Sequence, residues 1–169
     1  ARGQIRRRWT TKAWIACKLT FKGRQRQLMQ PGRYTELFFL DESVAAAAGH
    51  RPCAECRRAD YNAFKALWQI TIGPVGKVAE MDAMLQAARV DPQTRGQRRS
   101  HSRWATLPSG CFVWHRQTPH LVADQSLRPY SPSGYGPAIP RPTQGMAEVM
   151  TPAPLVTLMQ AGWLVETAS

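Results

Sequence analysis

The feature that most constrains this chain is a pair of cysteines, Cys53 and Cys56, within residues 49–56, whose sequence is GHRPCAEC. Thiolates two residues apart, on a tight turn that enters a helix, can both reach one tetrahedral metal ion. Zinc is the expected ion because it suits sulfur and imidazole donors and needs no redox chemistry. Two thiolates do not complete a site, so the fold has to bring further donors to this turn.

We expect Cys17, which lies on a predicted strand upstream, to be the third ligand. The fourth donor stays open, and we include His50 in the predicted ligand set because it is close in sequence. Asp60, His101 and Cys111 are the alternatives. Ligation mainly by cysteine on a tight turn favours a closed structural site over a catalytic site with an open water position. A redox dithiol and an inert buried cysteine pair are the two alternatives to a metal.

Residues 39–57 resemble the second half of the Ada-type metal-binding module. The family pattern is a phenylalanine and an acidic pair, then a helix of small residues, then Gly-Tyr-Arg-Pro-Cys-x-x-Cys; Phe39, the pair Asp41–Glu42 and residues 45–48 follow it. The resemblance implies zinc binding and contact with DNA. Family members hold zinc with four cysteines, one of which accepts a methyl group. Because His50 replaces the tyrosine and only Cys17 is visible upstream, we carry over zinc binding and not the repair chemistry. The rest of the chain resembles no characterised family.

Hydrophobic periodicity and turn residues predict an α+β protein. A small zinc module of strands and helices is followed by a β meander and a C-terminal helix. We divide the chain into residues 1–90, with a basic arm and the zinc module, and residues 91–169, packed with the first part as one unit. The strands are expected at residues 13–21, 25–29, 34–40, 110–115, 120–123 and 126–130. The helices are expected at residues 42–48, 57–70, 77–90 and from 151 to 161, and irregular structure at residues 91–103 and 129–142. Asp41 is expected to cap the first helix and Gly49 to end it. Helical spacing predicts that an aromatic stripe of the second helix is core, and that the third helix turns inward the residues Val78, Met81, Met84 and Leu85.

Charge is the strongest global signal, because 23 lysines and arginines face 11 acidic residues and give a net charge of +12. A basic excess of this kind attracts polyanions and predicts nucleic-acid binding, with DNA expected over RNA. A solvated basic face, or contact with an acidic protein or lipid, would explain the same charge. Two tryptophans among these basic residues, Trp9 and Trp104, are predicted to stack on bases. The expected phosphate contacts are Arg6, Arg7, Arg8, Lys22, Arg24, Arg26, Arg95, Arg98, Arg99 and Arg103.

Catalysis is the alternative to simple binding. A histidine flanked by arginines can act as a general base while guanidinium groups stabilise phosphate charge, so His101 and Arg99 are the expected residues of a nucleic-acid-processing hydrolase, with Asp124 as a partner. A zinc-stabilised protein-interaction module is a third hypothesis. The arginine-rich N-terminus has no apolar run followed by a cleavage site, and no apolar stretch is long enough to span a bilayer. We therefore expect a cytoplasmic protein without a membrane partner.

Overall fold

The structure is a computed structural model, and it describes residues 7–23, 27, 28, 30 and 36–168. It combines helices with one large antiparallel sheet and a C-terminal helix, which confirms the α+β prediction. The helices are α1 (Glu42–Ala47), α2 (Arg58–Thr71), α3 (Val78–Arg89) and α4 (Ala153–Gln160), with a short 3-10 turn η1 (Trp104–Thr106). None of the described helices is long and apolar enough to cross a membrane.

The sheet has seven strands in the order β3-β9-β4-β5-β6-β7, with β8 pairing β6 on the side of that path. Strands β4, β5 and β6 form the predicted meander, and β9 returns from the end of the chain to lie between β3 and β4. The strands are β3 (Ser100–Arg103), β4 (Phe112–His115), β5 (Thr118–Ala123), β6 (Ser126–Ser131), β7 (Gly134–Tyr135), β8 (Ile139–Pro140) and β9 (Met146–Val149).

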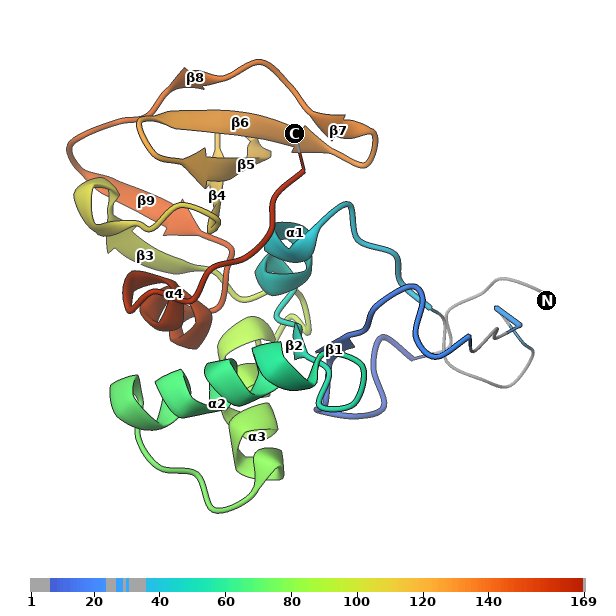
Figure 1. The fold of residues 1–169 in the computed structure, drawn as a ribbon. Helices are drawn as coiled ribbons and strands as arrows, with labels where there is room; N and C mark the ends of the chain where they lie inside the picture. Colours follow the sequence, from blue (N-terminus) through green and yellow to red (C-terminus); the bar gives the residue numbers. More distant parts are fainter. Residues whose placement is uncertain (1–6, 24–26, 29, 31–35, 169) are drawn as a thin grey trace.

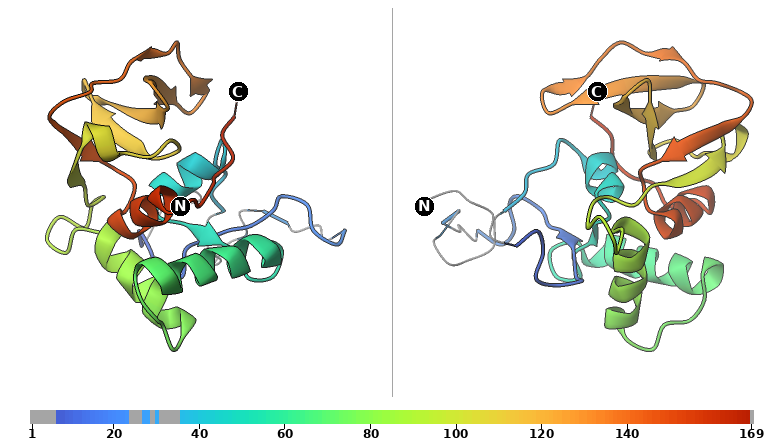
Figure 2. Two further views of the ribbon diagram at one scale, coloured as in Figure 1. Left: turned by 60° about the vertical axis from the view of Figure 1, so that its left-hand side comes forward. Right: turned by 180° about the vertical axis from the view of Figure 1, so that it is seen from behind.

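The molecule is built in three levels, which the views agree on (Figures 1 and 2). The sheet lies at one end, α1 and α4 lie beneath it, and α2 and α3 form the opposite end. One hydrophobic cluster runs through all three levels and joins Phe64 and Trp68 of α2 to Val113 of β4 and Leu155 of α4. The two halves that the sequence suggested therefore share this core.

Local sequence signals placed the helices well. Asp41 accepts a hydrogen bond from the backbone N–H of Val44 at 2.8 Å, so it caps α1 as expected, and Gly49 follows the helix at φ +84°. The aromatic stripe of α2 is core, as predicted. On α3, Met81 and Leu85 are buried as expected, whereas Met84 is 43% exposed.

Three strand predictions were wrong in extent. Residues 36–40 form no regular structure and leave Phe38 exposed; residues 31–35 lie outside the described part of the chain. Within residues 13–21 only β1 (Ile15–Ala16) is a strand, and it pairs in parallel with β2 (Arg51–Pro52). Residues 27 and 28 are irregular, and residues 25, 26 and 29 are not described.

Regular structure also occurs where we expected none. Residues 100–103 form β3 because they pair with β9, which the sequence analysis did not predict. Residues 129–142, rich in proline and glycine, contain the end of β6 together with β7 and β8. In each case the strand exists through pairing with a partner far along the chain or across a turn.

Candidate metal centre

The short parallel pair of β1 and β2 brings three cysteines together. Cys17 follows β1 and Cys53 follows β2, and the backbone N–H of Cys53 donates to the carbonyl of Ala16 at 3.1 Å. Cys56 lies one turn further on, just before α2. The three Sγ atoms all lie within 4.8 Å of one another. These three cysteines, close enough to bind a metal ion, are the only such group of three or more among the described residues.

Backbone donors already point at two of the sulfurs. The N–H of Lys18 donates to Cys56 Sγ at 3.2 Å, and the N–H of Glu55 donates to Cys53 Sγ at 3.4 Å. For Cys53, burial acts to raise the pKa, but hydrogen bonds from the backbone of Cys56 and Glu55 outweigh it and lower the pKa. Burial, followed by the hydrogen bond to Cys53, raises the pKa of the Cys17 thiol. The Cys53 thiol therefore loses its proton more readily than the Cys17 thiol, and a metal ion has to displace the proton of Cys17.

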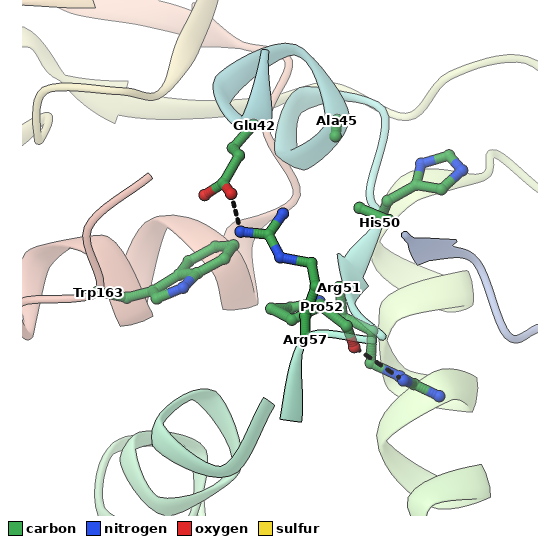
Figure 3. A pocket seen from close by; sticks show the side chains of 8 residues that line it. Glu42, Ala45, His50, Arg51, Pro52, Arg57 and Trp163 are labelled. Atoms are coloured by element: carbon green, nitrogen blue, oxygen red, sulfur yellow. Dashed lines mark hydrogen bonds and ion pairs between the residues drawn. The ribbon is translucent and has the colours of Figure 1, made fainter. Parts of the chain in front are cut away.

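The two arginines of the motif hold the turn in place. Arg51 is buried and makes a bidentate pair with Asp82 of α3, at 2.7 Å from Nε and 2.9 Å from Nη2, and its guanidinium also lies over the ring of Tyr61. Arg57 bonds Asp60 at 2.9 Å and pairs with Glu42 of α1. Figure 3 shows that Arg57 points up to Glu42 beside Trp163. The turn that carries Cys53 and Cys56 is therefore tied to both α1 and α3.

Gly49 in the motif is required by close packing. A Cβ atom at this position would come to 2.5 Å from Cδ of Arg89, and the backbone is at positive φ. The Arg89 side chain donates to the carbonyls of Gly49 at 2.8 Å and Lys12 at 2.7 Å. Its guanidinium lies 3.9 Å from the ring centre of Trp14. Arg89 therefore joins α3, the motif and the N-terminal segment at one point.

His50, which we included in the ligand set, is not part of the sulfur group. Its ring contacts those of Trp14 and Phe39, with ring centres 5.3 Å and 4.7 Å away, and among the described residues its buried Nδ1 has no hydrogen-bond partner. Burial, followed by the charge of Arg89, lowers the pKa of His50 to about 4. This geometry corrects the assignment: His50 packs as a neutral aromatic side chain. In Figure 3 its ring points away from Arg57.

The other proposed fourth donors also lie outside the group. Cys111 is fully buried in the main core, where burial raises its thiol pKa to about 12. His101 is exposed on β3, and Asp60 pairs with Arg57. Among the described residues the group is therefore Cys17, Cys53 and Cys56.

The N-terminal basic arm and the arginine-rich segment after α3 touch each other. Arg8 Nη1 donates to the carbonyl of Arg95 at 3.0 Å, and the guanidinium of Arg95 lies 4.8 Å from the ring centre of Trp9. Arg7 and Arg98 are exposed beside them in sequence. Two basic segments that are about 90 residues apart in the sequence thus form one surface. We call residues 7–9, 95 and 98 the arm surface.

The remaining predicted contacts lie elsewhere. Lys22 is exposed, with its ammonium group over the ring of Phe21, while Arg6, Arg24 and Arg26 lie outside the described residues. Trp104 is only 5% exposed and belongs to the core, so it cannot stack on a base. The sequence placed it beside arginines, but η1 turns its ring inward.

His101 lies on β3, and Arg99 directly precedes this strand. Arg99 bonds Glu148 at 3.0 Å, and its guanidinium lies 4.1 Å from the ring centre of Trp114. His101 is directly opposite Glu148 in the pairing of β3 with β9, whereas Asp124 lies in a turn and accepts no bond from it. The sequence analysis missed Glu148 and Trp114. The alternation of apolar and polar residues in 146–149 is the signal that could have revealed β9.

Comparison with known proteins adds no relative. No family model matches the chain, no curated protein is significantly similar to it, and no solved structure matches its fold. The resemblance to the Ada-type module therefore rests on the motif of residues 39–57 and on the three clustered cysteines.

Proposed function

We propose that this chain is a zinc-stabilised nucleic-acid-binding protein, with DNA as its expected partner. The observation that carries the proposal is the contact of Arg8 and Trp9 with Arg95, which joins two basic segments into the arm surface. In a chain of net charge +12, a surface of clustered guanidinium groups complements the phosphates of a nucleic acid.

Zinc is the ion that best suits the three cysteines. In a tetrahedral site with a Zn–S distance of about 2.3 Å, neighbouring sulfurs are roughly 3.8 Å apart. The Sγ atoms here, within 4.8 Å of one another, can reach that spacing by side-chain rotation. The backbone N–H groups that already donate to Cys53 and Cys56 would stabilise bound thiolates.

A bound metal ion would affect nucleic-acid binding through the N-terminal segment that carries Arg8 and Trp9. Cys17 directly follows β1, and the chain before β1 is held by Arg89 through the carbonyl of Lys12. Trp9 and Arg8 lie three and four residues further out, against Arg95. A metal ion on Cys17 would therefore fix one end of the segment that carries the arm surface.

The test is binding of a labelled DNA duplex at increasing salt. The affinity should fall steeply, with a slope of about −0.9 per phosphate contacted. The double variant Arg8→Ala/Arg95→Ala should weaken binding about tenfold or more and flatten the slope by up to about 2. Lys77→Gln is the control for the loss of one charge outside the arm surface, because Lys77 is exposed at the start of α3.

The zinc part is tested separately. The purified protein should contain about one zinc per chain, and Cys17→Ser should lower zinc affinity by more than about 100-fold. The variant should also bind DNA more weakly than the zinc-loaded protein. Absence of any DNA or RNA affinity at low salt would reject the nucleic-acid proposal, and unchanged zinc affinity would reject Cys17 as a ligand.

A nucleic-acid hydrolase is the second candidate, because His101 shares a sheet face with Arg99 and Glu148. It requires turnover that His101→Ala abolishes while the fold is retained. Cleavage that survives this substitution would remove His101 from any mechanism.

A further inference from the structure

One face of the sheet carries a row of polar and aromatic side chains that the core does not use. The pairing places His101 opposite Glu148, and Glu148 opposite Trp114. Because side chains alternate along a strand, Arg103 shares the face of His101, and the ion pair with Glu148 brings the side chain of Arg99 to the same face. We call Arg99, His101, Arg103, Trp114 and Glu148 the sheet-face row.

The opposite face of the same strands is packed. Val113, Ala147 and Val149 are at most 1% exposed and belong to the main core. On the side of the row, Phe112 and Leu121 pack against Ala47 of α1. His101 and Arg103 are exposed, and Trp114 is half-buried. Along β4, Trp114 of the row therefore lies on the same face as Phe112, two residues beyond its contact with α1.

Arg99 is held in a fixed position on this face. Glu148 Oε1 accepts from its Nη1 at 3.0 Å, and its guanidinium carbon lies 4.1 Å from the ring centre of Trp114. Two partners on two different strands therefore orient one planar guanidinium group. A guanidinium plane backed by an indole ring is a surface on which a nucleic-acid base can stack.

The row continues into an open groove at its other end. Arg103 is paired with Met146, and both line a groove of about 310 Å³ where β3 ends and β9 begins. The rest of the lining is Ala105, Thr143, Gln144 and Gly145. The amide of Gln144 and the hydroxyl of Thr143 offer both donors and acceptors to the edge of a base. The volume is at the lower end of the range for ligand sites.

We propose that the sheet-face row and this groove bind single-stranded nucleic acid, with one base stacked on Arg99 and Trp114 and the next base near Gln144. The inference rests on the proposed function and names its substrate class. Charge supports it, because the row has two arginines and one acid, and that acid is already paired with Arg99. An exposed sheet reaches the flat face of a base only when the base is unstacked, which selects single strands over a duplex.

The experiment compares three labelled probes of equal length with the zinc-loaded full chain: oligothymidylate, oligouridylate and a DNA duplex. The wild-type protein should bind at least one single strand more tightly than the duplex. Trp114→Leu and Arg103→Gln should each weaken single-strand binding about tenfold and duplex binding much less. The two single-stranded probes distinguish DNA from RNA.

Arg103→Gln keeps the test decisive if Trp114→Leu unfolds the protein, because Arg103 is exposed and its loss leaves no cavity. Lys77→Gln removes the same charge at the start of α3, a helix that lies at the end opposite the sheet (Figure 1), and should leave single-strand affinity unchanged. Equal losses for Arg103→Gln and Lys77→Gln would overturn the proposal, since charge alone would then explain binding.

The outcome also separates this inference from the proposed function. No affinity for any of the three probes rejects both. Binding that Arg8→Ala/Arg95→Ala weakens but Trp114→Leu and Arg103→Gln do not would reject the sheet-face site alone. Tight binding of polyglutamate that Arg103→Gln abolishes, without single-strand binding, would show an acidic protein partner and overturn the proposal.

Discussion

The segment around Cys17, Cys53 and Cys56, which we call the cysteine segment, and the sheet are held together in different ways. The sheet buries Val113, Val122 and Leu127 completely, on strands of four to six residues. The segment around the cysteines has two strands of two residues each and leaves Leu19 83% exposed and Phe38 60% exposed. The first is stabilised by many buried apolar contacts, and the second by a few specific polar contacts.

This difference predicts where the molecule is vulnerable. Burial spreads the stabilisation of the sheet over many side chains, so no single polar group decides it. Around the cysteines, the order of the chain rests on the sulfur group, the Arg51–Asp82 pair and the bonds of Arg89. Removing one of these should affect this segment more than the sheet.

Metal removal should produce the largest effect. Structural zinc in small modules contributes on the order of 10 kcal/mol, and its loss unfolds them. We expect chelation to release the amides of residues 13–18 and 50–57 to fast hydrogen exchange, whereas the amides of β4 and β5 stay protected. Exchange measured by mass spectrometry, with and without chelator, checks this. Equal protection of both regions after verified metal loss would show that the cysteines do not hold a structural ion.

Asp82→Ala should have the next largest effect. It leaves Arg51 charged and buried without its partner, which costs about 3–5 kcal/mol in comparable sites. The matched control is Arg51→Met/Asp82→Leu, which removes both charges and should recover most of that loss. Chemical denaturation of the zinc-loaded proteins measures the difference. If Asp82→Ala is as stable as the wild type, the Arg51–Asp82 pair does not anchor the turn that carries Cys53 and Cys56.

What the sequence predicted well was local. The acidic cap at Asp41, the glycine after α1 and the Cys-x-x-Cys spacing each depend on neighbours within a few residues. The same local reasoning failed where distant partners decide the structure. Residues 100–103 look like a polar loop but become β3 through pairing with β9, and Trp104 becomes core through the turn that follows.

The candidate site shows the same division. Cys17 was correctly grouped with Cys53 and Cys56 because few types of side chain can supply a sulfur ligand to a metal ion. His50 was placed with them by proximity in sequence, but its surroundings are two aromatic rings from segments the sequence could not position. The Arg99–Glu148–Trp114 cluster was missed because it requires the register of three strands.

The pH dependence of stability should distinguish the two regions through His50. Its pKa falls to about 4 in the folded chain against about 6.5 in the unfolded chain, so the unfolded state binds more protons between these values. The free energy of unfolding should therefore decrease as the pH falls from 6.5 to 4, by up to about 3 kcal/mol.

The control for this prediction is His50→Phe, which fills the place between Trp14 and Phe39 without a titrating group. Other titrating groups, including the thiols, contribute alike to both proteins. The unfolding free energy of the wild type minus that of the variant should thus be smaller at pH 4 than at pH 7. A difference that stays constant with pH would show that His50 is not buried as a neutral ring.

Tyr135→Phe should give the smallest effect and tests the joint between the two regions. The Tyr135 hydroxyl on β7 donates to Asp41 at 2.7 Å, and Asp41 also caps α1 and accepts from the backbone of Ala168. Removing the hydroxyl deletes one hydrogen bond to a charged group and keeps the ring packed on Phe112, so stability should drop by about 1–2 kcal/mol. Asp41→Asn retains one acceptor for the cap but loses the oxygen that accepts from Tyr135 and from Ala168, so it should cost more than Tyr135→Phe. If Tyr135→Phe speeds hydrogen exchange in α1 and leaves exchange in β6 and β7 unchanged, the bond stabilises the helix alone. Faster exchange in α1 and also in β6 and β7 would show that Asp41 couples the sheet to the cysteine segment. Loss of metal would then affect the sheet only through this hydrogen bond and through the shared core.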